Sequence, residues 1–424
     1  MILNKYSLGI GDRFGHQAKA QLAAIIKANQ RTAKLSGSEQ TLDIIPVWNK
    51  SHREHTIIGT KPSDTRRQVD EAVKSCQWNE PYFVDADHIN LNNVDEFIEV
   101  CDFFTIDVAD YIARPADKDQ VNDFIKKNKQ YLGSLTIPAV NETFHITEEQ
   151  TQAISNKYLS AVKEAGKIYQ YIVKVKGTDN FITEVSMDET VEPQSPIELF
   201  LILAGIAQEG IPAQTIAPKF TGRFNKGVDY IGDIDKFAQE FYEYLAVIAF
   251  AVKEFNMPES LKLSIHSGSD KFSIYQPMKQ AMKKFDAGLH LKTAGTTWLE
   301  ELIGLAMAGG EGLALVKEIY SKAFLNIDEL CRPYAAVIDI KKKNLPVPGE
   351  IEKWSEQDFA QALRHDQTCP KFSPDLRQLL HVGYKIAAQM GTRYIDALEK
   401  YEDIIASNVT ENIYERHIKS LFLD

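Results

Sequence analysis

The stretch Lys262-Leu-Ser-Ile-His-Ser-Gly-Ser-Asp-Lys271 organises this chain. An apolar run ends abruptly there in His266, and small polar and charged residues follow at once. Parallel α/β proteins present their chemistry at the carboxyl ends of strands in this way. A second stretch of the same kind, Leu289-His-Leu-Lys-Thr-Ala-Gly295, comes next and carries His290. The sequence therefore predicts a parallel α/β fold with reactive groups where its strands end.

Short strand-like runs alternate with longer helical patterns through the first 295 residues. Most of these runs are continuously apolar, which is typical of strands buried on both faces. The predicted strands are Tyr6–Asp12, Asp43–Asn49, Tyr82–His88, Phe103–Ala109, Phe181–Asp188, Gln214–Phe220, Leu261–Ser267 and Leu289–Gly295. Helices are predicted between them at Gln17–Asn29, Ser63–Lys74, Asn93–Cys101, Ser195–Gln208 and Ile234–Phe255. Eight such strands favour a (β/α)8 TIM-type barrel, with an open doubly wound sheet as the alternative.

Two parts of the chain depart from a plain barrel. The connection from Asp110 to Asn180 is longer than one helix needs, and it holds helical patterns at Lys118–Tyr131 and Glu148–Ile172. We therefore expect a barrel domain at 1–295 with a helical insertion at about 110–180. Residues 296–424 are expected to form a helical C-terminal extension packed on the barrel, with helices at Trp298–Ala308, Gly312–Ala323, Ser355–Leu363, Leu376–Met390 and Arg393–Ser407.

The bulk composition excludes several classes of protein. A net charge of −11 leaves no basic excess to neutralise phosphates, so a nucleic-acid partner is not expected. The four cysteines form no CxxC pair and are typical of reduced thiols in the cytoplasm. The N-terminus has no basic-then-apolar signal region, and the longest apolar stretch, Leu245–Val252, is too short to span a bilayer. We expect a cytoplasmic protein without a membrane segment.

Polar and ionisable residues lie at the ends of all eight predicted strands. In a barrel these ends meet at one face, so a shared active face is predicted. Polar loops alone would explain one or two such ends, but not eight. The residues in chain order are Asp12 and Arg13, Asn49 and Lys50, Asp87 and His88, Asp107, Glu184 and Asp188, Lys219 and Arg223, His266 with Ser267 and Asp270, and His290 with Lys292.

A divalent metal site is one interpretation of these ends. His88, His266 and His290 with the strand carboxylate Glu184 offer imidazole and carboxylate ligands, which suit Zn, Ni, Mn, Fe or Co. No local ligand motif such as HExxH is present, and each histidine alone would more often be a hydrogen-bonded structural residue. The remaining histidines lack a strand context and are expected to be surface or helix residues: His16, His52, His55, His145, His365, His381 and His417.

Basic side chains at the same face are candidates for binding an anionic substrate. They are Arg13, Lys50, Arg53, Lys219, Arg223, Lys271 and Lys292, and their alternative role is internal ion pairing with neighbouring aspartates. Asn49, Ser267 and Asp270 are further candidate substrate ligands. The segment Gly9-Ile-Gly-Asp-Arg-Phe-Gly15 has GxGxxxG rather than GxGxxG spacing, so no dinucleotide cofactor is predicted.

Several of these motifs together resemble the tagaturonate epimerase family. They are Gly11-Asp-Arg-Phe-Gly15, Asp85-Ala-Asp-His88, Phe104-Thr-Ile-Asp107, Ala217-Pro-Lys-Phe-Thr-Gly-Arg-Phe-Asn-Lys-Gly-Val-Asp-Tyr-Ile-Gly-Asp233, Ser264-Ile-His-Ser-Gly-Ser-Asp-Lys-Phe272, His290-Leu-Lys-Thr-Ala-Gly-Thr296 and Leu379-Leu-His-Val-Gly-Tyr-Lys-Ile-Ala387. The resemblance covers nearly the whole chain. It implies a metal-dependent barrel isomerase that interconverts two small keto-sugar acids, tagaturonate and fructuronate, in hexuronate catabolism. The chain departs from the family pattern at Asn49–Thr56, and it begins almost at the Gly-Asp-Arg motif.

The implied reaction restricts the chemistry. The inverted carbon is β to both the ketone and the carboxylate, so its C–H bond is not acidified and simple deprotonation is difficult. Retro-aldol cleavage followed by re-addition is one route, and transient oxidation by a bound nicotinamide is the other. For the first route we expect His88, His266 and His290 to hold a metal that polarises the ketone.

The remaining candidates take the other roles of the retro-aldol route. Glu184 is a fourth ligand or the acid/base, with Asp87 as its partner. Arg13, Lys219, Arg223 and Lys292 are expected to bind the substrate carboxylate or oxyanion. A metal-dependent aldolase, an epimerase of another keto-sugar and a non-catalytic sugar-binding protein are the competing interpretations.

Overall fold

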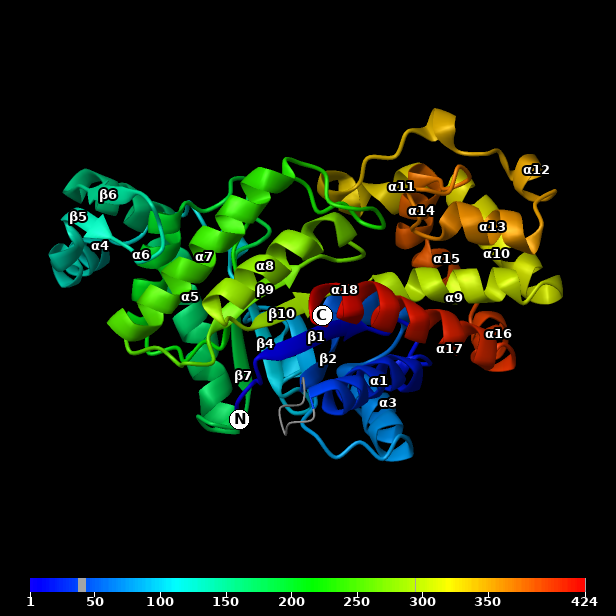
Figure 1. Ribbon diagram of the computed structural model, residues 1–424, viewed down its shortest axis with the longest axis horizontal. Helices are drawn as coiled ribbons and strands as arrows, with labels where there is room; N and C mark the ends of the chain where they lie inside the picture. The colour runs from blue at the N-terminus through cyan, green and yellow to red at the C-terminus, as the bar shows by residue number, and fades with distance from the viewer. Residues whose placement is uncertain (37–42, 294, 424) are drawn as a thin grey trace.

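Eight parallel strands close into a barrel at the centre of the molecule (Figure 1). The computed structural model describes residues 1–36, 43–293 and 295–423. The strands follow one another around the barrel in the order β1-β10-β9-β8-β7-β4-β3-β2. Their bounds are β1 (Tyr6–Gly11), β2 (Ile44–Ser51), β3 (Phe83–Ile89), β4 (Phe103–Asp107), β7 (Ile182–Ser186), β8 (Thr215–Ala217), β9 (Lys262–His266) and β10 (Leu289–Lys292). The predicted (β/α)8 barrel is confirmed; Ala294, within the predicted strand Leu289–Gly295, lies outside the described residues.

Helices surround the barrel as the apolar periodicity predicts. They are α1 (Ala18–Ser36), α2 (His52–Ile58), α3 (Pro62–Ser75), α6 (Pro196–Gln208), α7 (Ile234–Glu254) and α8 (Tyr275–Phe285). Several begin with a capping side chain; Ser195, for example, accepts the backbone N–H of Glu198, and Glu198 bonds back. The predicted helix Asn93–Cys101 is wrong, because this segment contains only a 3-10 turn at Val94–Glu96.

The segment between β4 and β7 stands at one end of the molecule (left in Figure 1). It contains α4 (Lys118–Lys127), the antiparallel pair β5 (Gly133–Thr136) and β6 (Thr143–Ile146), and the long helix α5 (Glu148–Lys176). The two short strands were not predicted from the sequence. Each has four residues and is largely exposed, so it has no apolar run that would distinguish it from a loop.

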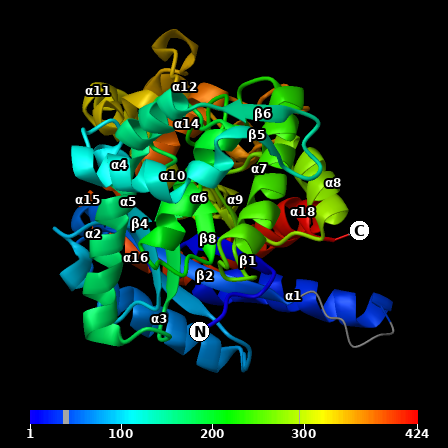
Figure 2. The same cartoon turned by 90° about the vertical axis from the view of Figure 1, so that its left-hand side faces the viewer.

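The C-terminal region is helical, and most of it lies at the opposite end of the molecule, while its last helix α18 lies near the barrel at the centre of the view (yellow to red in Figure 1). Its helices are α9 (Thr296–Met307), α10 (Gly310–Leu325), α11 (Ile327–Cys331), α12 (Pro348–Ile351), α13 (Glu356–Leu363), α14 (Pro374–Val382), α15 (Tyr384–Gln389), α16 (Thr392–Lys400), α17 (Glu402–Glu411), a π-helix at Asn412–Ile418 and α18 (Lys419–Leu421). Helix α17 packs against α9 and also against α1, so the end of the chain returns to its beginning. Figure 2 shows the molecule from its left-hand side, with β5 and β6 in the upper part of the view, above the labelled barrel strands.

The interior of the barrel changes from apolar to polar along the strands. Its amino-terminal layer is a small hydrophobic cluster of Leu3, Ile45, Val47, Phe83, Phe103 and Ile182. Side chains two residues further along a strand point the same way. In β3, Asp85 and Asp87 therefore point into the barrel on the same side as Phe83. In β7, Glu184 points the same way as Ile182. The polar residues therefore gather at the carboxyl ends of the strands. Among the described residues, no helix has both the length and the apolar character needed to cross a bilayer.

Candidate metal centre

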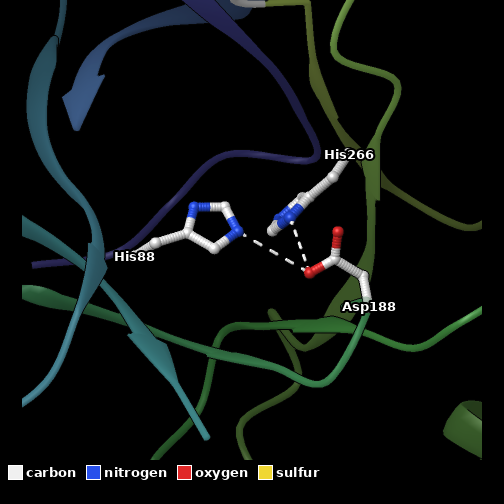
Figure 3. A group of neighbouring side chains, drawn as sticks. All are labelled: His88, Asp188 and His266. Carbon is white, nitrogen blue, oxygen red and sulfur yellow. Dashed lines mark ion pairs between the residues drawn. The ribbon is translucent and has the colours of Figure 1, made fainter. Parts of the chain in front are cut away.

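Two histidines and one aspartate converge at the carboxyl ends of the strands (Figure 3). His88 lies near the end of β3, His266 ends β9, and Asp188 follows β7 by two residues. The Asp188 Oδ1 lies 3.2 Å from His266 Nδ1 and 3.7 Å from His88 Nε2. One potential ligand atom from each residue lies within 4.8 Å of the others. Two imidazoles and a carboxylate at this spacing can bind one divalent cation.

The backbone at His88 has an unusual conformation. Its φ angle is 58°, in the left-handed region that a non-glycine residue seldom adopts, and the pairing of β3 with β4 shifts register between Ala86 and Ile89. Such conformations cost free energy and cluster at functional sites. The irregularity carries the imidazole across the barrel mouth towards Asp188.

The other ring nitrogen of each histidine contacts a carboxylate of its own. His88 Nδ1 lies 2.8 Å from Asp87 Oδ1, and His266 Nε2 lies 2.8 Å from Glu184 Oε1. Metal-bound histidines commonly donate their other ring N–H to a carboxylate, which fixes both the tautomer and the ring orientation. Asp87 and Glu184, the predicted catalytic pair, therefore lie behind the two imidazoles.

Lys292 lies at the centre of the carboxylates below this group. Its Nζ lies 2.7 Å from Asp85 Oδ2, 3.0 Å from Asp87 Oδ1 and 3.1 Å from Glu184 Oε1. Burial acts to lower the pKa of Lys292, but the three carboxylates together raise it well above its ordinary value. Burial alone would raise the pKa of Glu184, and Lys292 with His266 brings it well below the usual range. The cluster is therefore ionic, with Lys292 and Glu184 both charged at neutral pH.

The carboxylates of this group outnumber its permanent cations, and the two histidines make up part of the difference when they are protonated. Burial disfavours the charged imidazole of His266, but Asp188 and Glu184 overcome this and raise its pKa to about 9. Burial likewise opposes charge on His88, whose pKa is nevertheless raised well above its usual range by Asp87 and Asp188. If both imidazoles lost their protons, Lys292 would be the one cation among the described residues paired with this group. The group has four carboxylates, those of Asp85, Asp87, Glu184 and Asp188. A divalent cation would restore the balance.

His290, the third predicted ligand, is not brought to this group. It is fully buried one layer deeper in the barrel, where its Nδ1 lies 2.8 Å from Ser7 Oγ and its ring packs on Phe103. Burial lowers the pKa of His290 to about 3, so it stays neutral. The register explains its place: His290 is opposite Ser264, whereas Lys292 is opposite His266.

The predicted substrate-binding residues divide into internal and accessible ones. Arg13 is buried in an ion pair with Glu54 and stacks on Tyr384. Lys292 belongs to the carboxylate cluster, and Ser267 donates to the Lys292 carbonyl at 2.6 Å.

Arg223 is exposed near Asp339. Asn49 is buried with an amide group that has no hydrogen-bond partner among the described residues, and Lys219 is half-buried beside the end of β8.

The whole chain matches a known family. A family model described as tagaturonate epimerase (UxaE) matches residues 1–421. The chain belongs to the tagaturonate epimerase family. A tagaturonate/fructuronate epimerase of Thermotoga maritima is 29% identical over 433 residues, which cover 98% of this chain and 80% of that protein. The family places the chain among carbohydrate epimerases, in the isomerase class.

Solved structures of a family member share the fold. The fructuronate-tagaturonate epimerase UxaE from Cohnella laeviribosi, crystallised with one glycerol, gives a TM-score of 0.80 at 22% identity and covers 99% of this chain and 82% of that chain. The native crystal structure of the same enzyme gives a TM-score of 0.77 at the same identity, with coverages of 99% and 82%. The barrel and its C-terminal helices are therefore an arrangement found in solved structures of this family.

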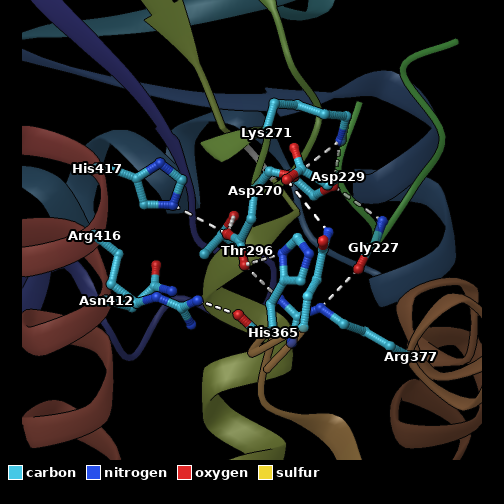
Figure 4. Close-up of polar contacts among 12 residues, drawn as sticks. Gly227, Asp229, Asp270, Lys271, Thr296, His365, Arg377, Asn412, Arg416 and His417 are labelled. Carbon is cyan, nitrogen blue, oxygen red and sulfur yellow. Dashed lines mark hydrogen bonds and ion pairs between the residues drawn. The ribbon is translucent and has the colours of Figure 1, made fainter. Parts of the chain in front are cut away.

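Asp270 lies in a second buried cluster, between the barrel and the C-terminal helices of this epimerase (Figure 4). Its Oδ1 accepts from Thr296 Oγ1 at 2.9 Å and lies 3.0 Å from His417 Nε2. Its Oδ2 accepts from Arg377 at 2.7 Å and lies 3.3 Å from His365 Nδ1. Asp270 was predicted to bind substrate, but in this structure it is fully buried and its carboxylate contacts protein groups on both oxygens.

Two features of these clusters were not apparent in the sequence. The sequence places Asp188 at a strand end, but nothing in the sequence distinguishes it from an ordinary loop aspartate. His365 was expected on the surface or in a helix, yet it lies in the connection between α13 and α14 and is 2% exposed. His381 and His417 are helical as expected, and both are buried. The buried positions depend on how the C-terminal helices fold back, which a local pattern does not contain.

Proposed function

We propose that this chain interconverts tagaturonate and fructuronate at a divalent metal centre held by His88, Asp188 and His266. The observation that carries the proposal is the two-histidine, one-carboxylate group at the barrel mouth of a chain that matches the family over its whole length. The metal is Zn, Ni, Mn, Fe or Co, because imidazole with carboxylate suits all of these ions. When bound, the metal would polarise the substrate ketone as a Lewis acid.

Retro-aldol cleavage is the proposed route. The hydroxyl on the carbon to be inverted loses its proton, the neighbouring C–C bond breaks, and its electron pair passes to the ketone as an enediolate. The fragments are the enediolate of dihydroxyacetone and a three-carbon aldehyde that carries the carboxylate. Rotation of the aldehyde and re-addition to its other face restore the bond and return the proton to the new hydroxyl, so no external oxidant or reductant is needed.

We assign the proton transfer to Asp87. Its carboxylate is 12% exposed at the mouth, whereas that of Glu184 is fully enclosed. Asp87 Oδ1 is held by His88 and Lys292, and burial, which opposes charge, is outweighed by these partners, so the pKa of Asp87 is lowered. Asp87 is therefore ionised at neutral pH, which a proton acceptor must be, and its lowered pKa makes it a weak base. Glu184 then acts through His266, whose ring it orients.

Lys292 is assigned to keeping this charge pattern fixed. It contacts Asp85, Asp87 and Glu184 at once and donates to Thr105 Oγ1 at 2.5 Å. Burial raises the pKa of Asp85 to about 7 although Lys292 opposes the shift. Without the ammonium, the remaining carboxylates would take up protons, and Asp87 would lose its ability to act as a base.

The proposal is tested by NMR of tagaturonate conversion in D2O with purified, metal-loaded protein. Retro-aldol chemistry predicts fructuronate whose inverted carbon keeps its original hydrogen, because that C–H bond never breaks. Deuterium at this carbon would show deprotonation instead and would contradict the route. Accumulation of dihydroxyacetone as the main product would identify an aldolase, and absence of any conversion with each of the five metals would overturn the assigned reaction.

A further inference from the structure

We propose that Lys226, with the imidazole of His381 and the turn at Gly268, anchors the carboxylate of the sugar acid beside the metal centre. This inference rests on the proposed function and adds a specificity-determining site to it. Lys226 lies in the connection between β8 and α7, and His381 comes from α14 in the C-terminal region. The anchor therefore joins the barrel to the helical region.

The turn after β9 places the Lys226 ammonium close to the metal centre. Gly268 follows the metal-ligand candidate His266 by two residues, which limits the separation of their Cα atoms to about 7 Å. Its φ angle is 64°, and a Cβ added there would lie 3.2 Å from Lys226 Nζ. The ammonium thus packs over a backbone that carries no side chain.

The backbone around Lys226 is fixed while its side chain is left available. Lys226 N–H donates to the Val337 carbonyl at 2.8 Å, and the Asn225 carbonyl accepts from Lys271 at 3.0 Å. Gly227 N–H donates to Ser269 Oγ at 3.0 Å. Among the described residues, Lys226 Nζ has no carboxylate within ion-pairing distance. A half-buried ammonium held without an anion is suited to binding an anionic ligand.

The neighbouring cations are already compensated or internal. Arg13 pairs with Glu54 at 2.8 Å, and Arg377 pairs with Asp270 at 2.7 Å. Lys271 is fully buried and donates to neutral oxygens. Of these four cations, only Lys226 is partly exposed and has no carboxylate partner within the described part of the chain.

Two buried polar side chains beside Lys226 also lack partners. His381 is 2% exposed, and its Nε2 makes no hydrogen bond within the described part of the chain; the amide of Asn225, 1% exposed, makes none either. The His381 ring packs so closely on Gly295 that a Cβ there would clash with it, and that same Cβ would lie 2.6 Å from the Gly268 carbonyl. Buried polar groups are normally paired, so these atoms indicate a missing ligand.

The charges around His381 point to an anion as that ligand. Burial lowers the pKa of His381 well below its usual value, and Arg13, Lys226, Lys271 and Arg377 lower it further. The neutral ring can donate one hydrogen bond, and Lys226 adds a positive charge that no carboxylate of the described residues neutralises. A carboxylate would gain from both.

The chemistry explains why a carboxylate anchor is needed. In the proposed cleavage the carboxylate stays on the three-carbon aldehyde, which has no other attachment to the protein once the C–C bond breaks. An ammonium that holds this end lets the aldehyde group rotate while the fragment stays bound. The same residue would favour sugar acids over neutral ketoses.

The test compares Lys226→Met with Lys226→Arg and with Lys236→Met, an exposed lysine in α7. We expect Lys226→Met to raise the KM for tagaturonate at least tenfold and to release dihydroxyacetone, detected by NMR, while its metal content stays that of the wild type. Lys226→Arg should recover most of the affinity, because the positive charge remains. Lys236→Met should match the wild type in every readout.

The outcomes separate this inference from the proposed function. If the wild type converts tagaturonate but Lys226→Met keeps its KM within twofold and releases no dihydroxyacetone, the anchor is wrong and the function stands. A rise in KM confined to Lys219→Met would also overturn the anchor. If the wild type itself converts no tagaturonate, the proposed function fails and the anchor falls with it.

Discussion

The molecule contains two clusters in which histidines surround an aspartate, and they differ in how completely that aspartate is satisfied. Around Asp270, two histidines, a threonine and Arg377 occupy both carboxylate oxygens, and Asp270 and Arg377 are fully buried. Around Asp188, both histidines are drawn to one oxygen, and the carboxylate side chain is 22% exposed.

The difference supports the proposal that the Asp270 cluster is structural and that the Asp188 cluster binds a metal. The Asp270 cluster balances one carboxylate against a guanidinium and closes on itself, which holds the C-terminal helices on the barrel. The Asp188 cluster has excess carboxylates and depends on protonated histidines for its balance. Residue types alone do not distinguish the two, whereas charge balance and access do.

Asp188→Asn is the substitution with the largest expected effect. The substitution removes a negatively charged metal ligand and keeps the size of the side chain. Metal affinity and tagaturonate turnover should therefore both fall by more than about a hundredfold, because substitutions of residues that only hold the ligands typically cost up to that amount. Metal analysis and an NMR turnover assay measure the two losses. Asp396→Asn, at an exposed residue of α16, is the matched control. Full metal content with full turnover in Asp188→Asn would remove Asp188 from the centre.

Asp270→Asn should act on stability instead. It leaves the buried Arg377 guanidinium without its charged partner, which typically costs about 3 kcal/mol or more in the free energy of unfolding. Urea unfolding measures that loss against Asp396→Asn. At temperatures where the variant is folded, its metal content should equal that of the wild type. Unchanged stability together with lost metal would reverse the roles of the two clusters.

The pH dependence of metal binding sharpens the comparison further. Because the pKa of His266 is raised to about 9 in the metal-free protein, a metal must displace a proton below that pH. Between pH 6.5 and 8.5, the affinity for the metal should rise roughly tenfold per pH unit for each proton that the metal displaces. Competition with a chelator measures this affinity. The metal-free protein should lose stability as pH rises from the unfolded value of 6.5 through about 9. Affinity independent of pH would show that His266 is not a ligand.

Glu300→Gln should have the smallest effect, on the Asp270 side of the molecule. Burial raises the pKa of Glu300 to about 7 although Arg377 opposes the shift, so the folded protein loses stability as pH rises from the unfolded value of 4.5 through 7. The neutral amide removes this cost, and we expect a gain of about 3 kcal/mol at pH 8 and little change at pH 4.5. Thermal unfolding at both pH values measures it; a loss at pH 8 would contradict the assignment.

The barrel was predictable because each strand is a separate apolar run that ends in polar residues, whereas the site depends on relations between strands. His88 and His266 were selected from their strand ends, and the structure brings them together. The register that sets Lys292 opposite His266 and moves His290 one layer down is not contained in either strand alone. The same holds for Asp188, which reaches the histidines from a turn, and for Lys226, which lies in a long connection.

The most direct test of the metal centre is the conversion of tagaturonate by protein stripped of metal and then supplied with Mn, Ni, Zn, Fe or Co. The assignment of His88, Asp188 and His266 predicts fructuronate only after a metal is added, with the activity abolished again by a chelator. Equal conversion by the stripped protein, with no metal detectable, would contradict the account.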